Sequence, residues 1–381
     1  LLIERQPDIL KANALDVDAA KAANMDAPRL DRLTLTPRIM ADMADACLHI
    51  AEMADEVGVI EQQWQRPTGL LVGRMRVPRG VIAMIYEARP NVTIDAAILC
   101  LKAGNAVILR GGSEAIHSNL ALAGLLHEAL RSAGLPEDAA QVVETTDRAA
   151  VAALCKLDQY IDVMIPRGGE GLVRAVTEAA TMPVLKHYKG VCHAFVDADA
   201  DLDKALDVVF NGKVQRPGVC NALECLLVHK DCAAAFLPRV GRRLGEAGVE
   251  FRACPASLPL LGPTAKAQSP DDLGQEFHAL ILAVRVVDDM DAALAHIARY
   301  GSNHTEIICT NDHEHAMRFL READASMVAV NASTRFNDGG QLGLGAEIGI
   351  STSKLHAYGP MGVQELTTTK FVVFGQGQVR Q

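Results

Sequence analysis

The sequence predicts an α/β protein with two successive domains, each built around a parallel sheet. Between residues 80 and 196, short apolar segments alternate with helical patterns, as in a doubly wound sheet. A second alternating series runs from about residue 223 to residue 330. The chain has 381 residues, 49% of them hydrophobic, which is enough apolar material for two or three domains. We therefore expect a nucleotide-type domain, a boundary near residue 200, and a second α/β domain.

The first domain is expected to contain N-terminal helices and a small arm. Residues 1–23 are expected to be helical, and residues 37–50 carry apolar side chains at three- and four-residue spacing. Residues 70–77 alternate between two prolines and predict a strand in a hairpin-like arm. The first parallel sheet is expected to have strands at 81–86, 106–109, 141–144, 161–165 and 191–196, with helices at 93–101, 115–132, 147–157 and 170–180.

The second domain repeats the alternation. Its strands are expected at 223–228, 280–287, 306–309 and 327–330, and its helices at 202–211, 233–246, 290–299 and 314–321. Residues 253–276 contain four prolines and few periodic apolar residues, which predicts a long irregular connection. Residues 365–374 are β-branched and aromatic and predict a last strand, which pairs either with residues 70–77 or with another subunit.

Composition excludes several classes of protein. The 37 basic and 47 acidic side chains give a net charge of −10, which argues against nucleic acid as the main partner. No stretch approaches the roughly 20 uncharged apolar residues that a membrane span needs, so no membrane partner is expected. The nine cysteines form no Cys-x-x-Cys pair and predict reduced thiols in a cytoplasmic protein. The twelve histidines form no convincing ligand pair beside a third ligand, so we predict no metal.

One cysteine differs from the others in its surroundings. Cys220 lies in a polar turn that contains Lys213, Arg216, Pro217 and Gly218, whereas the other eight lie in apolar segments. Nearby cations favour the thiolate, which is the nucleophilic form of cysteine. The alternative is a structural cysteine, and the loop context alone does not decide between the two.

Two glycine-rich junctions could receive a phosphate group. Arg110-Gly111-Gly112-Ser113 follows one expected strand, and Gly168-Gly169 follows another. Glycine lets backbone amides approach an anion, and the following helix N-terminus favours negative charge. Neither segment has the Gly-x-Gly-x-x-Gly spacing of dinucleotide-binding loops, so each could equally be a plain turn.

A third glycine-rich segment follows the last buried strand. Residues 331–353 contain glycines, hydroxyl groups and Arg335, a combination that suits a substrate-wrapping loop in which arginine grips a carboxylate or phosphate. A flexible surface loop is the equal alternative.

Together these segments resemble a known family. The residues that carry the resemblance are 85–93, 104–112, 165–169, 190–193 and 331–349. They resemble the gamma-glutamyl phosphate reductase family, a branch of the aldehyde dehydrogenase superfamily, from about residue 30 to the C-terminus.

The resemblance implies an activity and a nucleophile. The family reduces L-glutamyl 5-phosphate to L-glutamate 5-semialdehyde with NADPH and releases phosphate, in the second step of proline biosynthesis. Cys220 matches the family's nucleophile, which forms a thioester that hydride then reduces. Backbone amides near Cys220, with Asn221, would stabilise the oxyanion.

The resemblance also assigns cofactor and substrate residues. It puts Arg110, Gly111, Gly112, Ser113, Gly168 and Gly169 along the cofactor, and it likens Glu276 and Phe277 to the superfamily pair that holds the nicotinamide ribose. An acidic amino-acid phosphate needs cationic partners, for which the candidates are Arg89, Arg216 and Arg335.

An aldehyde-dehydrogenase-like fold follows from the same resemblance. We expect an NADP-binding domain at 1–65 and 79–200, a catalytic domain at 201–364, and a β arm for oligomerisation at 66–78 and 365–381. A homodimer or homotetramer is expected, as a stand-alone enzyme functionally coupled to glutamate 5-kinase.

One segment departs from the wider superfamily. Hydrolytic aldehyde dehydrogenases carry Glu-Leu-Gly-Gly where this chain has His187-Tyr188-Lys189-Gly190, so the glutamate that activates water is absent. This departure favours a reductase over the two alternatives, a hydrolytic aldehyde dehydrogenase and a catalytically silent nucleotide-binding protein.

Overall fold

The chain folds into two compact units. The computed structural model describes residues 1–380, apart from the side chain of Pro28, so Gln381 of the expected arm lies outside the described residues. Unit 1 consists of Leu1–Lys186, Gly343–Ile350 and the residues from Pro360 onward, and unit 2 consists of His187–Leu342 and Ser351–Gly359. No helix within residues 1–380 is long and apolar enough to cross a membrane.

Unit 1 contains seven α-helices and a parallel sheet. The helices are α1 (Gln6–Ala22), α2 (Ala27–Leu33), α3 (Pro37–Glu52), α4 (Val92–Lys102), α5 (Ile116–Ser132), α6 (Ala149–Leu154) and α7 (Glu170–Ala179). The sheet strands are β3 (Val81–Tyr86), β4 (Ala106–Arg110), β5 (Ala140–Val142) and β6 (Val163–Arg167). All pair in parallel in the order β5-β4-β3-β6.

The first sheet has four named strands, and the expected fifth lies elsewhere. Residues 192–196 form β7 (Cys192–Val196), which pairs with strands of unit 2. Our assignment of this strand to the first sheet is therefore wrong, and the first segment of unit 1 extends to Lys186. Its residues are all buried, and a strand buried on both faces does not reveal which of two parallel sheets it joins.

The order of strands in unit 1 reverses at β3. From β3 the chain moves outward through β4 to β5 and then returns to β6 on the other side of β3. Ligands of such sheets bind beyond the carboxyl ends of the strands, where the order reverses. The turns that follow β3, β4 and β6 meet at this edge, and the Glu87 N–H donates to the Arg167 carbonyl oxygen at 3.1 Å.

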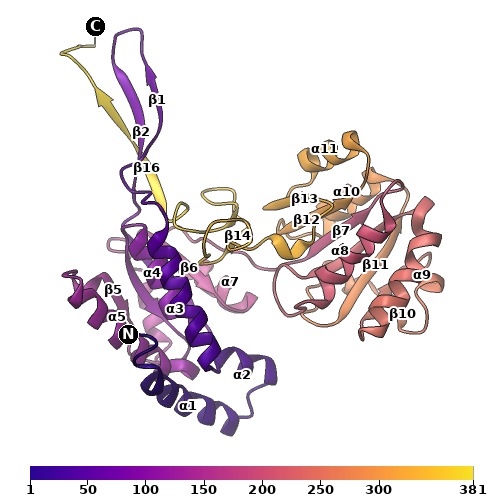
Figure 1. Cartoon of the computed structure of the whole chain (residues 1–381), viewed down its shortest axis with the longest axis horizontal. Coiled ribbons are helices and arrows are strands. Elements are labelled where there is room, and N and C mark those ends of the chain that lie inside the picture. The colour runs from indigo at the N-terminus through magenta and orange to yellow at the C-terminus, as the bar shows by residue number, and fades with distance from the viewer. Residues whose placement is uncertain (381) are drawn as a thin grey trace. The chain divides into compact units, whose positions relative to one another are not determined.

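A three-stranded antiparallel arm projects from the α/β body of unit 1 (Figure 1). It is formed by β1 (Ile60–Gln65), β2 (Leu71–Pro78) and β16 (Thr367–Phe374), with β2 in the middle. The expected pairing of the last strand with residues 70–77 is confirmed. β1 was not expected, because four of its six residues are exposed polar side chains and its sequence does not alternate. Residues 60–65 therefore belong to the arm.

Unit 2 contains a seven-stranded parallel sheet. Besides β7, its strands are β8 (Leu223–His229), β9 (Glu250–Ala253), β10 (Ala265–Ala267), β11 (Ile281–Val287), β12 (Thr305–Cys309) and β13 (Met327–Val330). Its helices are α8 (Leu202–Val214), α9 (Lys230–Glu246), α10 (Met290–Tyr300) and α11 (His313–Glu322). The strand order is β10-β9-β11-β8-β7-β12-β13. β14 (Ile350–Ser351) and β15 (Gly359–Pro360) form a separate two-stranded sheet.

Two apolar clusters show that helices cover both faces of the unit 2 sheet. Helices α8 and α9 contribute to one cluster with Val209, Phe236 and Val240, and α10 and α11 contribute to the other with Ile297 and Phe319. This doubly wound arrangement confirms the expected second α/β layer. The connection at 253–276 contains less irregular structure than expected, because β10 within it adds an edge strand to the sheet.

Candidate active site

The Cys220 turn joins α8 to β8 at the amino end of the unit 2 sheet. The helix ends at Val214, since Pro217 cannot continue it, and the apolar strand begins at Leu223. Cys220 is half-buried, and of the nine cysteines only Cys47 shares this partial exposure, while the other seven are buried. The turn that the sequence distinguished thus presents an accessible thiol.

Lys213 does not act as a free cation beside the thiol, as the sequence suggested. Its Nζ donates to Glu224 Oε2 at 2.7 Å, and both side chains are completely buried. Burial lowers the pKa of Lys213 and raises that of Glu224 to about 7. The pair links the last turn of α8 to β8 and so fixes the two ends of the Cys220 turn.

The backbone of Gly190 lies directly against the backbone of Cys220. A Cβ atom at position 190 would overlap the Cys220 carbonyl oxygen and lie 2.7 Å from its carbonyl carbon. Cys192, two residues further along, is buried, and its Sγ donates to the same carbonyl oxygen at 3.2 Å. Only glycine permits this approach, which fixes the main chain of Cys220.

We expect Gly190→Ala to lower kcat about 100-fold, because backbone atoms of the Cys220 turn must move and displacements of about 1 Å have effects of that size. Steady-state kinetics measure this, with a melting curve to confirm folding. Gly218→Ala is the matched control in the same loop, since its Cβ would meet its nearest neighbour at 3.9 Å. Equal kinetic losses in both variants would contradict the role of Gly190.

Two histidines that the sequence did not single out as site residues lie beside the thiol. One ring nitrogen each of His187 and His304 and the Sγ of Cys220 all lie within 4.8 Å of one another. His187 is half-buried and His304 is fully buried. The three residues precede β7, β8 and β12, whose amino ends share one edge of the parallel sheet. No sequence spacing could reveal the group, because 33 and 84 residues separate its members from Cys220.

A buried amide connects the Cys220 turn to His304. Asn221 donates from Nδ2 to the Asn337 carbonyl oxygen at 2.9 Å. Asn337 in turn donates from Nδ2 to Thr305 Oγ1 at 2.8 Å and to the His304 carbonyl oxygen at 3.1 Å. The Thr305 hydroxyl also lies 2.8 Å from Nδ1 of His304. Asn221 and Asn337 therefore fix the position of the Cys220 turn relative to His304.

Glu276 and Phe277 also lie in unit 2. Burial opposes ionisation of Glu276, but a hydrogen bond and the charge of His278 outweigh it and lower the Glu276 pKa, with help from the Gly190 backbone N–H. Glu276 thus stays a carboxylate in contact with the main chain that packs on Cys220. Phe277 packs against the cluster that contains Phe195 and Phe319.

The three candidate substrate arginines divide between the units. Arg335 is half-buried, its Nε donates to Gln215 Oε1 at 2.8 Å, and burial lowers its pKa. The charges of Arg216 and Cys220 both act on Arg335, so the three groups are near one another. Arg89 belongs to unit 1, so Arg216 and Arg335 are the two candidate substrate arginines of unit 2.

The glycine junctions of unit 1 follow β4 and β6, at the carboxyl edge of the first sheet. The N–H of Gly169 donates to Glu87 Oε2 at 3.0 Å, and the N–H of Ala88 donates to Glu114 Oε1 at 2.6 Å. A Cβ at Gly168 would overlap the Glu87 carboxylate, and one at Gly112 would overlap that of Glu114. Two carboxylates thus lie against the loops in which the sequence suggested a phosphate site.

Arg110 supplies positive charge at this edge. Its guanidinium is largely buried and donates to the Thr146 carbonyl oxygen at 3.1 Å, while its Nε has no hydrogen-bond partner. Gly111 packs against Asn119, and Ser113 begins the short 3₁₀ turn that leads into α5. The loop thus contains a buried guanidinium with one N–H that donates to no partner, beside closely packed backbone.

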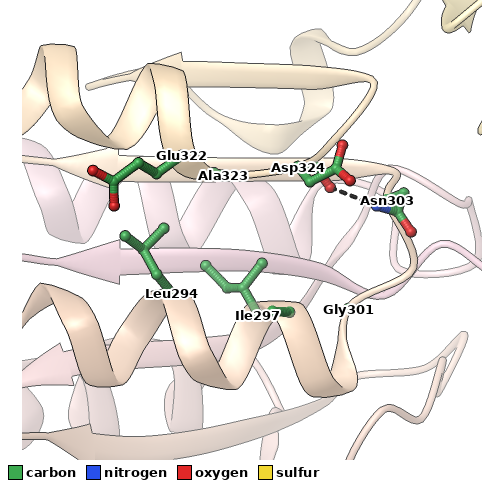
Figure 2. Close-up of a pocket in the computed structure, with 8 residues that line it drawn as sticks. Leu294, Ile297, Gly301, Asn303, Glu322, Ala323 and Asp324 are labelled. Atoms are coloured by element: carbon green, nitrogen blue, oxygen red, sulfur yellow. Dashed lines mark hydrogen bonds between the residues drawn. The ribbon is translucent and has the colours of Figure 1, made fainter. Parts of the chain in front are cut away.

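A small cavity elsewhere in unit 2 does not include these groups. Figure 2 shows it between α10 and the segment that follows α11, lined among others by Leu294, Ile297, Asn303 and Asp324. Its volume is about 140 Å³. Its carboxylates are paired with neighbours, since Asp324 binds Lys354 at 2.6 Å and Glu322 binds Arg318 at 2.9 Å. We assign it no part in catalysis.

Comparisons with known proteins agree on one family. The model of the aldehyde dehydrogenase family matches residues 4–269. The chain is 75% identical over its whole length to a gamma-glutamyl phosphate reductase of Nitratidesulfovibrio vulgaris, and equally to one of Desulfovibrio desulfuricans, covering 91% of each. A crystal structure of a gamma-glutamyl phosphate reductase from Thermotoga maritima is 46% identical, with a TM-score of 0.96 over 100% of this chain and 92% of that one.

Proposed function

The chain belongs to the aldehyde dehydrogenase family and, within it, to the gamma-glutamyl phosphate reductases of proline biosynthesis, and we propose that Cys220 is its nucleophile. The observation that carries this proposal is the accessible Cys220 thiol, held against Gly190 within 4.8 Å of two imidazoles. The enzyme reduces L-glutamyl 5-phosphate to L-glutamate 5-semialdehyde.

The Cys220 thiolate attacks the acyl carbon of the substrate. An S–C bond forms, the C–O bond to phosphate breaks, and inorganic phosphate leaves. Backbone N–H groups of the turn, among them that of Asn221, stabilise the oxyanion of each tetrahedral intermediate, while the Asn221 side chain stays bonded to the Asn337 carbonyl oxygen. After reduction, the C–S bond of the thiohemiacetal breaks, which releases the aldehyde and restores the thiolate. Ring nitrogens of His187 and His304 lie within 4.8 Å of the sulfur, a separation that one water molecule can bridge to exchange its proton and that of the thiohemiacetal.

The family uses a nicotinamide cofactor, which supplies the hydride for the thioester carbon when bound. The residues at the carboxyl edge of the unit 1 sheet fit such a group. The unpaired Nε of Arg110 provides an unused donor, and the glycines at 111, 112, 168 and 169 add no side chain of their own, although the carboxylates of Glu114 and Glu87 lie against Gly112 and Gly168. We propose that these residues and Ser113 hold the phosphates, that Glu276 and Phe277 hold the nicotinamide ribose, and that NADPH is preferred.

Glu114 provides a test of the cofactor assignment. We expect Glu114→Gln to lower the KM for NADPH about two- to fivefold relative to that for NADH, because a carboxylate beside Gly112 repels the additional phosphate of NADPH. Glutamine keeps an acceptor for the Ala88 N–H, so the turn is preserved. Initial rates with both cofactors at low ionic strength measure the ratio, and Glu137→Gln, in an exposed ion pair with Arg131, is the control. An unchanged ratio would place the cofactor phosphates elsewhere.

We propose that unit 1 binds the cofactor and that unit 2 carries the catalytic residues. Arg335 and Arg216 supply charge for the acidic substrate in unit 2, and Arg89 is a further candidate from unit 1. If Arg335 binds substrate, Arg335→Ala raises the KM for the semialdehyde and leaves that for NADP⁺ unchanged.

Phosphate, rather than water, resolves the thioester in the reverse direction. His187 occupies the position at which hydrolytic relatives carry the water-activating glutamate, so the chain lacks that base. We expect NADP⁺ reduction by glutamate semialdehyde to depend strictly on inorganic phosphate, followed by NADPH absorbance with phosphate present and absent. Equal rates without phosphate would support a hydrolytic aldehyde dehydrogenase, and no activity in either would support a silent nucleotide-binding protein.

The proposal extends to the oligomeric state, the cellular compartment and the source of the substrate. Exposed apolar side chains on β16, Phe371, Val373 and Phe374, support a homodimer or homotetramer formed through the arm, which light scattering can test. Nine unpaired cysteines support a reducing cytoplasm. An acyl phosphate hydrolyses readily in water, so functional coupling to glutamate 5-kinase, which makes it, is expected.

A further inference from the structure

We propose that Cys220, His187 and His304 also form an inhibitory binding site for a borderline-soft divalent cation, of which Zn²⁺ is the representative. This inference rests on the proposed role of Cys220, because a metal-bound thiolate cannot attack the acyl phosphate. It concerns an ion that binds reversibly and stops turnover, and it assigns no metal to the catalytic cycle.

The ligand types and their separations suit zinc. Thiolate sulfur and imidazole nitrogen are the ligands that zinc prefers, at about 2.3 Å and about 2.0 Å. In a tetrahedral site these bond lengths place the ligand atoms roughly 3.3 to 3.7 Å apart. The three atoms here already lie within 4.8 Å of one another, so side-chain rotations can bring them onto one ion. Water can complete the tetrahedron.

The group is also accessible and partly oriented. Cys220 and His187 are half-buried, which leaves a path for the ion. His304 is buried, and its ring contacts the Thr305 hydroxyl. Metal-binding histidines commonly donate their second ring N–H to a neighbouring oxygen. Nδ1 of His304 lies 2.8 Å from Thr305 Oγ1, and the tautomer that donates there keeps the lone pair on Nε2. The Asn337 amide fixes the Thr305 hydroxyl in turn.

Charges of both signs lie near the group: Arg216 and Arg335 oppose a cation there, and the loss of the thiol proton and the Glu276 carboxylate favour one. Zinc replaces the thiol proton, so one S–H bond breaks, one S–Zn bond forms and one proton leaves to solvent. The Glu276 carboxylate lies near this part of unit 2, since the charge of His187 acts on it. Its negative charge offsets part of the positive charge that the ion brings, whereas the charge of Glu224 is already paired with Lys213.

A second group in unit 2 provides the competing location. Ligand atoms of His193, Cys225 and His296 also lie within 4.8 Å of one another, but all three residues are buried. His193 contacts Glu306 at 3.0 Å, which already neutralises a protonated imidazole without any metal. Burial without an entry path makes this group the control rather than the site.

The test measures zinc binding without turnover. The full-length protein is titrated with Zn²⁺ against a chromophoric chelator, with neither NADPH nor substrate present. We expect one ion per chain, with affinity at least tenfold weaker in Cys220→Ala and in His304→Gln, and unchanged in His296→Gln. A loss of affinity in His296→Gln alone, or equal affinity in Cys220→Ala and the parent, would overturn the inference.

A measurement on the unmodified protein guards against misfolded variants. Zinc should slow alkylation of Cys220 at least tenfold and leave that of Cys47 unchanged, as followed by peptide mass spectrometry, and a chelator should restore the original rate. An unaffected rate at Cys220 refutes the site. Zinc binding through Cys220 in a protein without phosphate-dependent activity would refute the proposed function instead, so the two failures remain distinct.

Discussion

Replacing Cys220 with alanine is expected to lower turnover at least about 1,000-fold while leaving the fold and NADPH binding intact. No other thiol can take its place, because Cys192, whose Sγ lies against the same turn, is buried, and burial raises its pKa well above the usual range. Loss of an enzyme's covalent nucleophile commonly has effects of this size or larger. The variant should keep its structure, since the Cys220 side chain is half-exposed and fills no core position.

The measurement combines three readouts. Steady-state rates give the loss of turnover, fluorescence titration gives the dissociation constant for NADPH, and a melting curve gives stability. Cys47→Ala is the matched control, because Cys47 is the other half-exposed thiol and lies in α3 of unit 1. Substantial turnover in Cys220→Ala, or equal losses in both variants, would show that the nucleophile is another residue.

The thioester itself should be observable. Mixing the parent enzyme with glutamyl phosphate in the absence of NADPH should add one glutamyl group to the peptide that contains Cys220, detected by mass spectrometry. The adduct should persist because, as the resemblance implies, this chain has His187 where hydrolytic aldehyde dehydrogenases carry the glutamate that activates water. Rapid loss of the adduct to water would contradict this interpretation of position 187.

The sequence predicted the strands better than their sheets. An apolar run such as Val81–Tyr86 indicates a strand buried on both faces whichever sheet contains it. The same property hid the partners of β7, whose position between β8 and β12 depends on contacts across more than 100 residues of chain. β1 was missed for the opposite reason, since its side chains are exposed and carry no alternation.

Some residues of the candidate site could likewise be predicted from the sequence, and others could not. Cys220 could be found because the turn around it is polar, which is a local signal. His187 and His304 could not, because what unites them is the shared amino edge of parallel strands. Our general expectation for such sheets pointed to the carboxyl ends, where the glycine junctions of unit 1 lie, whereas the thiol of unit 2 lies at the amino ends. Nor did the sequence show that Glu224 neutralises Lys213.

That buried ion pair leads to the second large effect. We expect Lys213→Met to destabilise unit 2 by about 3 to 5 kcal/mol at neutral pH, because it leaves the Glu224 carboxylate buried without its partner. The loss should appear in urea unfolding followed by circular dichroism, and turnover should fall with it because the pair joins the ends of the Cys220 turn. Lys230→Met removes an exposed partner of Asp288 and should change the free energy of unfolding by less than about 1 kcal/mol.

The pH dependence of Lys213→Met identifies the cause. Burial already raises the Glu224 pKa to about 7 in the presence of Lys213, which acts to lower it, so removing the lysine raises it further. A group whose pKa is higher folded than unfolded contributes stability at low pH and loses it as the pH rises through the folded value. The parent loses the same stability up to its own folded value of about 7, so the deficit of Lys213→Met relative to the parent should grow as the pH rises above about 7. Adding Glu224→Gln should remove this growth and recover much of the stability, since glutamine is neutral and still accepts from the His278 N–H. A deficit that does not change with pH would mean that lost packing of the lysine stem, rather than an unpaired carboxylate, destabilises the variant.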